Sequence, residues 1–258
     1  MDKIKLEKID MAKAQEYVQA IYARRAVLSN YYGQTFEKND KYFETNNTFV
    51  LVKSVRDFYR IYIASNDKKE LVELLSGLKG TNVVNFPIKG DIRGIDTIMT
   101  ESGYEPIGIY ERYILKVNDL ECNGDMATIT FATEEDEEAT YNLYSNWKDF
   151  NPYTDWLPTQ LELREFIKKK AVIINKQNNR VVGVVICPIL NGQIRWNLLI
   201  DLSGGGLKLV NAMFKMAQDN KIKNCQFWVN SCNEKAIKFH RRLGAIPDGL
   251  KDYTYIKR

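Results

Sequence analysis

The chain of 258 residues contains a single histidine, His240. It lies in the stretch NSCNEKAIKFHRRLGA, residues 230–245, where the apolar spacing and the closing glycine predict a helix. An imidazole has a reference pKa of about 6.5, so it can exchange a proton near neutral pH. His240 is therefore a candidate proton donor. The alternative interpretation is an aromatic-like side chain that packs on a bound ligand.

A run of three glycines, residues 204–206, is the second candidate for chemistry. It lies in DLSGGGLKLVNAMFKMA, which indicates a strand end, a loop and an amphipathic helix. Glycines let successive backbone N–H groups approach a pyrophosphate, and the N-terminus of the following helix adds a positive dipole. The pattern therefore favours a loop that binds a phosphorylated ligand.

Periodic patterns predict the elements that position these residues. In the first half of the chain the predicted order is helix, two strands, helix, strand, helix, strand. The ranges are 11–32, 49–55, 58–65, 68–80, 82–88, 91–104 and 107–117.

A polar stretch with the turn signal Asn123-Gly124 ends the first half, so the predicted boundaries are 1–118 and 126–258. In the second half, helices are predicted after Thr133, where an acidic run begins, and over 158–170, 207–220 and 233–244. Strands are predicted over 126–133, 171–177, 180–190, 193–201, 224–230 and 253–258. Both halves end in strand–helix–strand–helix–strand, which indicates an internal structural repeat.

The composition excludes several classes of protein. The net charge is +4 and the basic residues are interleaved with acids, which argues against a nucleic-acid partner. No run approaches the roughly 20 apolar residues of a membrane span. The cysteines have no metal-type spacing, so we expect no metal and interpret them as free thiols in a reducing cytoplasm. They are Cys122, Cys187, Cys225 and Cys232.

The glycine loop and the closing helix resemble the GCN5-related N-acetyltransferase (GNAT) superfamily. The loop of that family is Gln/Arg-x-x-Gly-x-Gly/Ala after the fourth strand, and Gly204 and Gly206 fall on its two small positions. Its closing motif is Asn-x-x-Ala-x-x-Phe-Tyr-x-x-x-Gly-Phe, matched here by Asn233, Ala236, Phe239 and Gly244, with His240 in place of the tyrosine. In the family that tyrosine commonly protonates the departing thiolate.

The resemblance implies an α/β (α+β) fold with two tandem GNAT-like domains. Each would be a mixed, mostly antiparallel twisted sheet flanked by helices. The match covers residues 126–258 well, whereas residues 1–118 match by element order and by GIDTIMTESGYEP. The first half lacks the glycine loop, so we expect no cofactor there.

The activity that the resemblance implies is transfer of an acyl group from acetyl-CoA or another acyl-CoA to an amine, by direct attack in a ternary complex. The acceptor would be a small molecule or a peptide, and the protein a monomer or homodimer with no membrane or nucleic-acid partner. His240 would be the catalytic residue. Cofactor contacts would come from Leu202, Ser203, Gly204, Gly205, Gly206, Leu207, Asn233 and Phe239.

Two further features depart from the family pattern. Asp201 stands where the family prefers Gln or Arg, and a carboxylate repels a pyrophosphate. It either points away and caps the following helix, or it weakens binding of CoA. The strand 193–201 also lacks the glutamate that often acts as general base. The base would then come from Glu134, Glu135, Asp149 or Asp155, or the acceptor would lose its proton to solvent.

The acceptor site is predicted in NWKDFNPYTDWLP, residues 146–158, because aromatic rings with carboxylates suit a cationic amine or a sugar. Its candidate residues are Trp147, Asp155 and Trp156, joined by Trp228 from the strand 224–230. The alternative is a loop whose aromatics plug the interface between the halves. LSNYYGQTF, residues 28–36, has the same two interpretations.

Two other functions are compatible with this sequence. A GNAT-like domain can bind a ligand or a protein without turnover, which Asp201 and the absent glutamate would favour. Peptidoglycan-bridge aminoacyltransferases are also tandem GNAT-like proteins and use aminoacyl-tRNA. The mild charge, the lack of a coiled-coil arm and the glycine loop argue against this last class.

Overall fold

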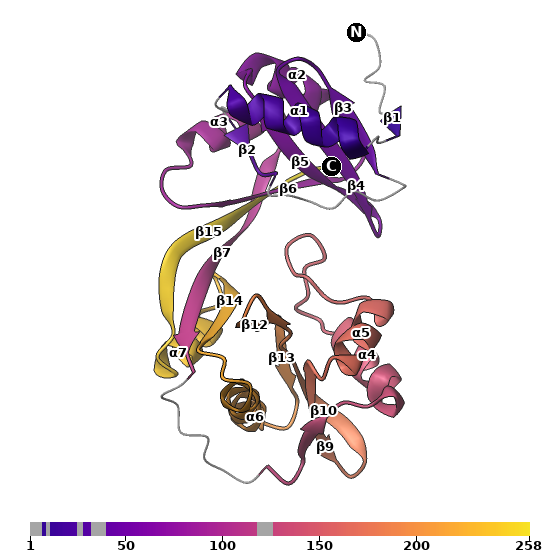
Figure 1. Ribbon diagram of the computed structural model, residues 1–258, viewed down its shortest axis with the longest axis vertical. Coiled ribbons are helices and arrows are strands. Elements are labelled where there is room, and N and C mark those ends of the chain that lie inside the picture. Colours follow the sequence, from indigo (N-terminus) through magenta and orange to yellow (C-terminus); the bar gives the residue numbers. More distant parts are fainter. Residues whose placement is uncertain (1–6, 9–10, 25–27, 32–39, 118–125) are drawn as a thin grey trace. The chain divides into compact units, whose positions relative to one another are not determined.

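A computed structural model of the chain describes residues 7–8, 11–24, 28–31, 40–117 and 126–258 (Figure 1). These form two compact units. Unit 1 comprises Met1–Tyr110 and Gly249–Arg258, and unit 2 comprises Glu111–Asp248. The predicted turn at Asn123-Gly124, Cys122 and most of the aromatic segment 28–36 lie outside the described residues. No helix in the described ranges has the length and apolar content needed to cross a membrane.

Unit 1 is built on one mixed sheet. Its strands lie in the order β1 (Glu7–Lys8), β3 (Lys41–Glu44), β4 (Thr48–Val55), β5 (Phe58–Ser65), β6 (Asn82–Ile88) and β15 (Ile246–Lys257), and β2 (Leu28–Ser29) pairs with β5. A two-residue turn at Arg56 and Asp57 joins β4 to β5, with Arg56 at a φ of 53°. β5 and β6 run parallel because α2 (Lys68–Gly77) crosses between them.

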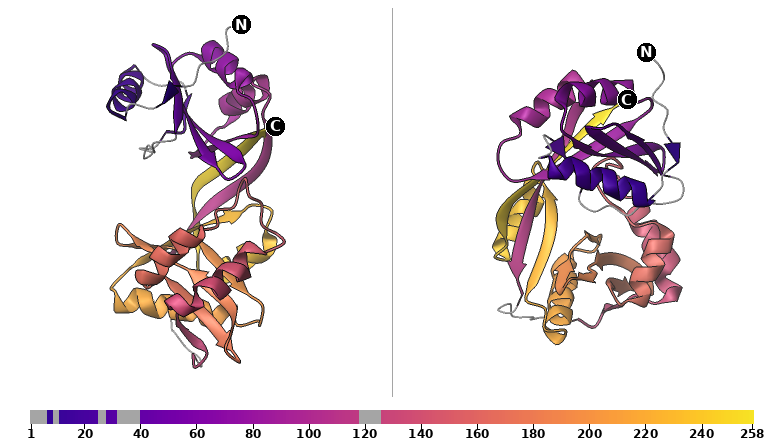
Figure 2. Two further views of the ribbon diagram at one scale, coloured as in Figure 1. Left: turned by 90° about the vertical axis from the view of Figure 1, so that its right-hand side faces the viewer. Right: turned by 45° about the horizontal axis from the view of Figure 1, so that its top comes forward.

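The helices of unit 1 cover both faces of this sheet. α1 (Met11–Ala23) lies on one face, and α2 and α3 (Arg93–Glu101) lie on the other (Figure 2, left). Alternate residues of a strand face opposite sides, so Phe49 and Leu51 pack against α1 while Val50 packs against α2 and α3. The sequence prediction of a helix over 11–32 is correct in type, but the helix ends at Ala23.

The last strand completes the sheet of unit 1. Residues 251–257 of β15 pair antiparallel with all of β6. Tyr255 packs on Phe86, and Lys257 donates hydrogen bonds to the carbonyls of Leu75 and Ser76 at the end of α2. β7 (Glu105–Lys116) begins in unit 1 and continues into unit 2 from Glu111 on. The units therefore differ from the predicted halves 1–118 and 126–258 by these two strand segments.

Unit 2 contains strands of two sheets. One is antiparallel, in the order β13 (Leu198–Asp201), β10 (Arg180–Ile186), β9 (Val172–Gln177) and β8 (Ile129–Phe131). In the other, β7 is followed by β14 (Asn224–Asn230), β12 (Gln193–Arg195) and β11 (Ile189–Leu190). The order β13, α6 (Gly206–Asp219), β14, α7 (Glu234–Arg242), β15 matches β5, α2, β6, α3, β7, so the predicted repeat of elements is confirmed.

Helices separate the layers of unit 2. α4 (Glu137–Ser145) and α5 (Gln160–Lys168) pack on one face of the antiparallel sheet through Tyr144, Leu163 and Ile167. α6 packs on the opposite face through Met213 and Phe214, which also contact the β7–β14–β12 strands. This central helix carries the glycine loop at its N-terminus.

The acidic run after Thr133 is a helix start held by ion pairs. Thr133 and Asp136 form a capping box at the short helix η1 (Glu134–Asp136), and Asp136 also pairs with Lys176 at 2.6 Å. Glu137 accepts two hydrogen bonds from Arg164, which lower the pKa of this carboxyl. These contacts account for Asp136 and Glu137 by structure alone.

Candidate functional site

The predicted strand 193–201 is two strands, because a β-bulge divides it. Leu198 pairs in register with Ile186, and the N–H of Asn197 also donates to the carbonyl of Ile186. Asn197 and Leu198 therefore both lie opposite Ile186. A bulge bends a strand and increases its twist. Before the bulge β12 runs parallel to β14, with Arg195 opposite Gln226; after it β13 runs along β10. β13 and β14 therefore diverge.

The divergence leaves backbone groups without strand partners. β13 is an edge strand of its sheet. Because alternate residues direct their backbone groups to opposite edges, and the N–H of Leu202 donates to Val182 on β10, the backbone groups of Leu199 and Asp201 face away from β10. On β14 the carbonyl of Gln226 accepts from Trp196, so the backbone of Trp228 points to the same side. Unpaired edges of this kind can bond an extended ligand.

His240 lies where the two strands part. Its ring contacts Trp196 edge-on at 4.8 Å and Phe227 at 4.3 Å between centroids, and Phe239 at 5.4 Å. Its Nδ1 is buried and has no hydrogen-bond partner among the described residues. Burial in this aromatic cluster lowers the pKa of His240 to about 4. The imidazole is thus neutral at pH 7, which favours packing over proton donation.

α7 presents His240 from a well-formed helix. The Asn233 side chain accepts the N–H of Ala236 at 3.0 Å and so caps the helix. Phe239 is partly buried against the core around α6. Asn233 and Phe239, both expected to contact the cofactor, therefore also hold the helix in place.

The glycine loop leaves several N–H groups available. Gly204 has a φ of 78°, a left-handed conformation that favours glycine, and Gly205 caps α6 with no side-chain hydrogen bond. In the described part of the chain, no acceptor bonds the N–H groups of residues 204–207. Four such groups at the positive end of a 14-residue helix form a cradle suited to an anion.

Asp201 faces into the protein and does not cap α6. Its Oδ1 accepts the Ser203 hydroxyl at 2.9 Å, and the Ser203 oxygen accepts the Asn175 amide at 3.1 Å. A Cβ on Gly183 would lie 2.6 Å from Asp201 Oδ1, and one on Gly205 would lie 2.8 Å from Asn175 Nδ2. Both glycines therefore make room for this relay, which supports the loop from behind.

Trp228 lies on the opposite face of its sheet from His240. Phe227 and Val229 are buried in the core with α6, so the intervening Trp228 points outward and is 39% exposed. The Arg112 guanidinium lies 5.9 Å from the Trp228 ring centroid and also pairs with Asp248. Trp228 and His240 are thus separated by the sheet.

The predicted acceptor segment 146–158 is a local structure of unit 2. Asp155 accepts the N–H of Asn151 at 2.8 Å, and the Trp156 ring packs edge-on against Phe166 of α5 at 6.0 Å. Trp147 is 37% exposed. None of these residues is among the ring neighbours of His240, so the predicted acceptor and catalytic residues are not brought into contact.

Several residues of this region were missed by the sequence analysis. They are Asn175, which holds Ser203; Trp196, which contacts His240; and Gln226, which is 7% exposed at the divergence. The glycine at 183 within a buried strand was the available signal, because such a glycine often marks a close approach.

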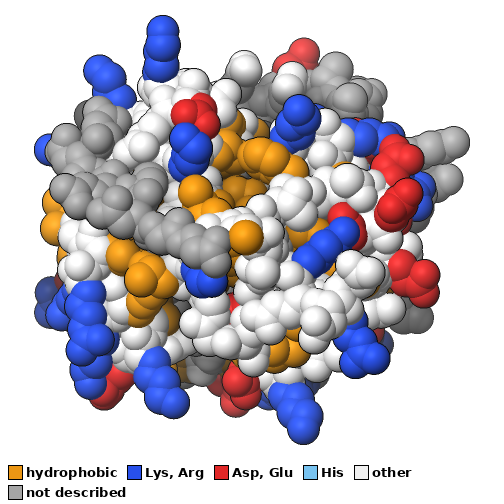
Figure 3. Space-filling model, turned by 90° about the horizontal axis from the view of Figure 1, so that it is seen from below, with side chains coloured by type: hydrophobic (Ala, Val, Ile, Leu, Met, Phe, Trp, Pro, Cys, Tyr) orange, Lys and Arg blue, Asp and Glu red, His pale blue; other side chains and the backbone are white. Residues whose placement is uncertain are grey.

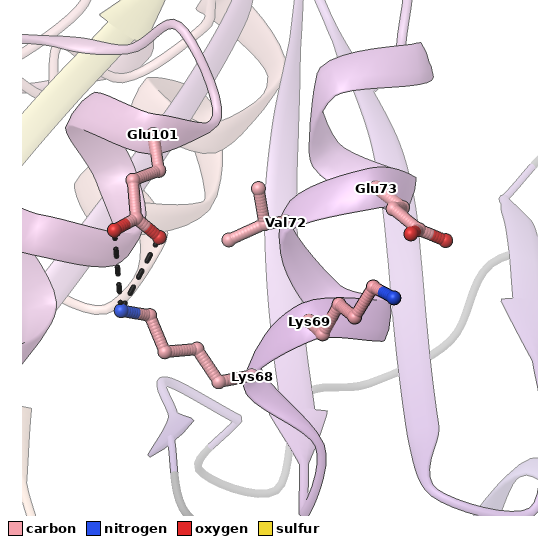
Figure 4. A pocket seen from close by; sticks show the side chains of 5 residues that line it. All are labelled: Lys68, Lys69, Val72, Glu73 and Glu101. Carbon is pink, nitrogen blue, oxygen red and sulfur yellow. Dashed lines mark hydrogen bonds and ion pairs between the residues drawn. The ribbon is translucent and has the colours of Figure 1, made fainter.

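Other described surfaces carry features of a different kind. A shallow pocket of about 380 Å³ lies in unit 1 between α2 and α3 (Figure 4). It is lined by Lys68, Lys69, Val72, Glu73 and Glu101, and Lys68 pairs with Glu101 at 3.2 Å. On the face seen from below relative to Figure 1, Lys and Arg side chains are scattered, and Asp and Glu side chains lie among them (Figure 3). In the described ranges, no group of His, Cys, Asp or Glu is placed to hold a metal ion.

Solved structures of low identity share this fold over the whole chain. A GCN5-related N-acetyltransferase from Sphaerobacter thermophilus matches with a TM-score of 0.65 and 14% identity, covering 100% of this chain and 96% of that one. A GNAT-family acetyltransferase from Colwellia psychrerythraea matches at 0.59 and 12%, covering 98% and 100%. A tandem GNAT protein from the clavulanic acid biosynthesis pathway matches at 0.59 and 9%, covering 98% of each chain.

These matches confirm the fold. The chain has the GNAT fold, in the tandem arrangement that its sequence predicted. No family model matches the chain, and no curated protein does.

Proposed function

We propose that this protein is an acyltransferase that moves an acyl group from a CoA thioester to an amine, and that unit 2 binds the acyl-CoA. The observation that carries the proposal is the loop at residues 202–207. Its N–H groups at residues 204–207 have no acceptor in the described chain, and they precede the long helix α6. This is the arrangement that favours a pyrophosphate.

The orientation of Asp201 supports retention of CoA binding. The carboxylate is bonded to Ser203 and fills the space left by Gly183, on the inner side of the loop. A charge that faces inward repels a pyrophosphate less than one on the loop surface. We therefore interpret Asp201 as a support for the loop and not as a disabling change.

The diverging strands suit the remainder of the donor. A pantetheine arm carries two amide groups, and the free backbone edges at Leu199, Asp201 and Trp228 offer matching donors and acceptors. The arm would then lie along β13 and place the thioester near Trp196 and Gln226. Binding in this position holds the thioester against the acceptor, which lowers the barrier through proximity.

The reaction is a direct transfer. The neutral amine attacks the thioester carbonyl carbon, a C–N bond forms, and the C–S bond breaks as CoA leaves as a thiolate. The amine loses its proton to solvent or to a base, and the thiolate is protonated. Because the pKa of His240 is about 4, we assign this residue to packing beside the thioester in place of proton transfer.

Calorimetric titration with acetyl-CoA tests this proposal. Gly206→Glu adds bulk and negative charge at the first residue of α6, where a Cβ meets only the Asp201 Cβ at an ordinary 3.9 Å. We expect the unmodified protein to bind and this variant to lose at least about 100-fold in affinity, because the cradle is filled and its charge is reversed. Gly94→Glu, at the start of α3 with open space around it, is the matched control.

Turnover is measured separately as release of the CoA thiol with a panel of amines. If acetyl-CoA binds but no amine of the panel is turned over, the non-catalytic function is supported. Absence of binding at millimolar acetyl-CoA would contradict the proposal. His240→Phe keeps the aromatic packing, so it should retain turnover if His240 only packs and lose it if His240 transfers a proton.

A further inference from the structure

The sheet face opposite His240 carries a second set of polar groups next to the divergence. Arg195 on β12 pairs in register with Gln226 on β14, and Ile194 pairs with Cys225. Ile194 and Cys225 are fully buried toward α6, so Arg195 and Gln226 project from the other face. Trp228, two residues beyond Gln226, shares that face.

Arg195 carries a charge with no partner among the described residues. Arg195 is half-buried as a residue, its guanidinium bonds no acceptor in the described residues, and its backbone N–H donates to the carbonyl of Pro188. Arg112 on β7, a second cation near Trp228, already pairs with Asp248. A guanidinium has five donors, and one without an acceptor in the described residues can bind an anion.

We propose that the amine acceptor carries a carboxylate, which Arg195 binds, while its apolar portion packs on Trp228. The acceptor would then be of the amino-acid class. The inference rests on the proposed acyl transfer, because it places the amine acceptor next to the strand divergence where the acyl-CoA is proposed to bind. Gln226, almost buried between Arg195 and Trp228, supplies an amide that can bond the same ligand.

Three physical arguments favour this ligand class. The planar guanidinium fork matches the two oxygens of a carboxylate. A fixed positive charge repels a plain cationic amine, so an acceptor at this face needs an anionic group to bind well. Trp228 is 39% exposed and offers an apolar surface, which an amino-acid side chain can cover.

Binding of matched ligand pairs tests the proposal without requiring turnover. The probes are L-phenylalanine with phenethylamine, and L-lysine with cadaverine; each pair differs by one carboxylate. Binding is followed by tryptophan fluorescence with and without CoA, and Trp228→Phe identifies the signal from this face. Of the two amino acids, we expect the one with the higher affinity to bind at least about 10-fold more tightly than the amine that lacks its carboxylate.

The preference should depend on Arg195. We expect Arg195→Gln to abolish it and Arg195→Lys to restore part of it, whereas Arg180→Gln, an exposed arginine at the start of β10, leaves it unchanged. Equal affinities within each pair, no saturable binding of either amino acid, or a preference that survives in Arg195→Gln would overturn the proposal. Unfolding curves of the Arg195 variants confirm that they are folded.

A turnover assay separates this inference from the proposed function. If acetyl-CoA is consumed equally well with both members of each pair, acyl transfer stands and the carboxylate site is wrong. If acetyl-CoA does not bind but the carboxylate preference is found and lost in Arg195→Gln, the ligand site stands and acyl transfer is wrong. If Arg195 serves in binding, we expect Arg195→Gln to raise KM and to leave kcat unchanged.

Discussion

The two units share one order of elements but differ at the point where two neighbouring strands diverge. In unit 1, Asn30 fills the point where β5 and β6 diverge. Its amide nitrogen donates to the carbonyls of Ile61 and Asn85, and its oxygen accepts the N–H of Ile63 at 2.5 Å. In unit 2, β13 and β14 diverge beside His240 and keep their backbone edges free.

The helices that follow differ in the same sense. Asp67 caps α2 by accepting the N–H of Glu70, so a carboxylate of the chain occupies the anion position. Gly205 caps α6 with no side chain at all. A few polar side chains thus close the first unit, whereas glycines leave the second open for a ligand. This supports the expectation that the first unit binds no cofactor.

Removal of Asn30 should have the largest effect. Asn30→Ala removes the partner of the Ile61 and Asn85 carbonyls and of the buried Ile63 N–H, so we expect unit 1 to lose about 3 kcal/mol of stability. Urea unfolding followed by far-UV circular dichroism measures this loss. All four tryptophans lie in unit 2, so fluorescence reports that unit separately.

Asn46→Ala is the control for this change, because Asn46 is exposed and its side chain makes no hydrogen bond among the described residues. A fluorescence transition that stays in place while the dichroism transition moves would show that the closure acts within unit 1. If Asn30→Ala is as stable as Asn46→Ala, the closing role of Asn30 is wrong.

The two units should also respond oppositely to acid. The pKa of His240 falls from 6.5 to about 4, so the unfolded chain binds more protons in this window and unit 2 loses stability as pH falls. Burial raises the pKa of Asp252 from 3.8 to about 6, although Asn85 and Arg60 oppose the rise. The folded state binds more protons between these values, so unit 1 gains stability as pH falls.

In each unit the free energy of unfolding should change by about 2 kcal/mol between pH 6 and pH 4. His240→Phe should remove the loss in unit 2, measured by fluorescence. Asp252→Asn should remove the gain in unit 1, measured by circular dichroism. Slopes of the same sign in both units would contradict the assignment of these two groups.

A smaller effect is expected behind the glycine loop. Asp201→Ala removes the acceptor of the Ser203 hydroxyl and should weaken acetyl-CoA binding by about five-fold, because the loop is held less firmly. Asp219→Ala, at the exposed end of the same helix, is the charge-matched control. If Asp201 instead repels the pyrophosphate, the variant binds more tightly, so the direction of the change decides between the two interpretations.

Local patterns predicted the elements of the site well. β14 lies where it was predicted, and α6 and α7 agree within two residues, because their apolar periods are strong and glycine ends α7. The short strand β3 was missed, since four residues carry little periodicity. Residue type and spacing thus sufficed for β14, α6 and α7, where the apolar pattern repeats along the element.

Features that depend on distant residues could not be predicted. The bulge at Asn197 arises because β12 pairs with β14 while β13 pairs with β10. The inward orientation of Asp201 depends on Gly183 and Asn175 from two other strands. The alternation of Phe227, Trp228 and Val229 did contain the signal that Trp228 faces away from the core.

The pairing of β15 with β6 has a consequence for synthesis. Tyr255 belongs to the core of unit 1, and Lys257 bonds the end of α2, but both leave the ribosome long after β6. At about 5–20 residues per second, the delay is on the order of ten seconds or more. During that time β6 has an unpaired edge, so the unit translated first is completed last and is the one that depends on protection from aggregation.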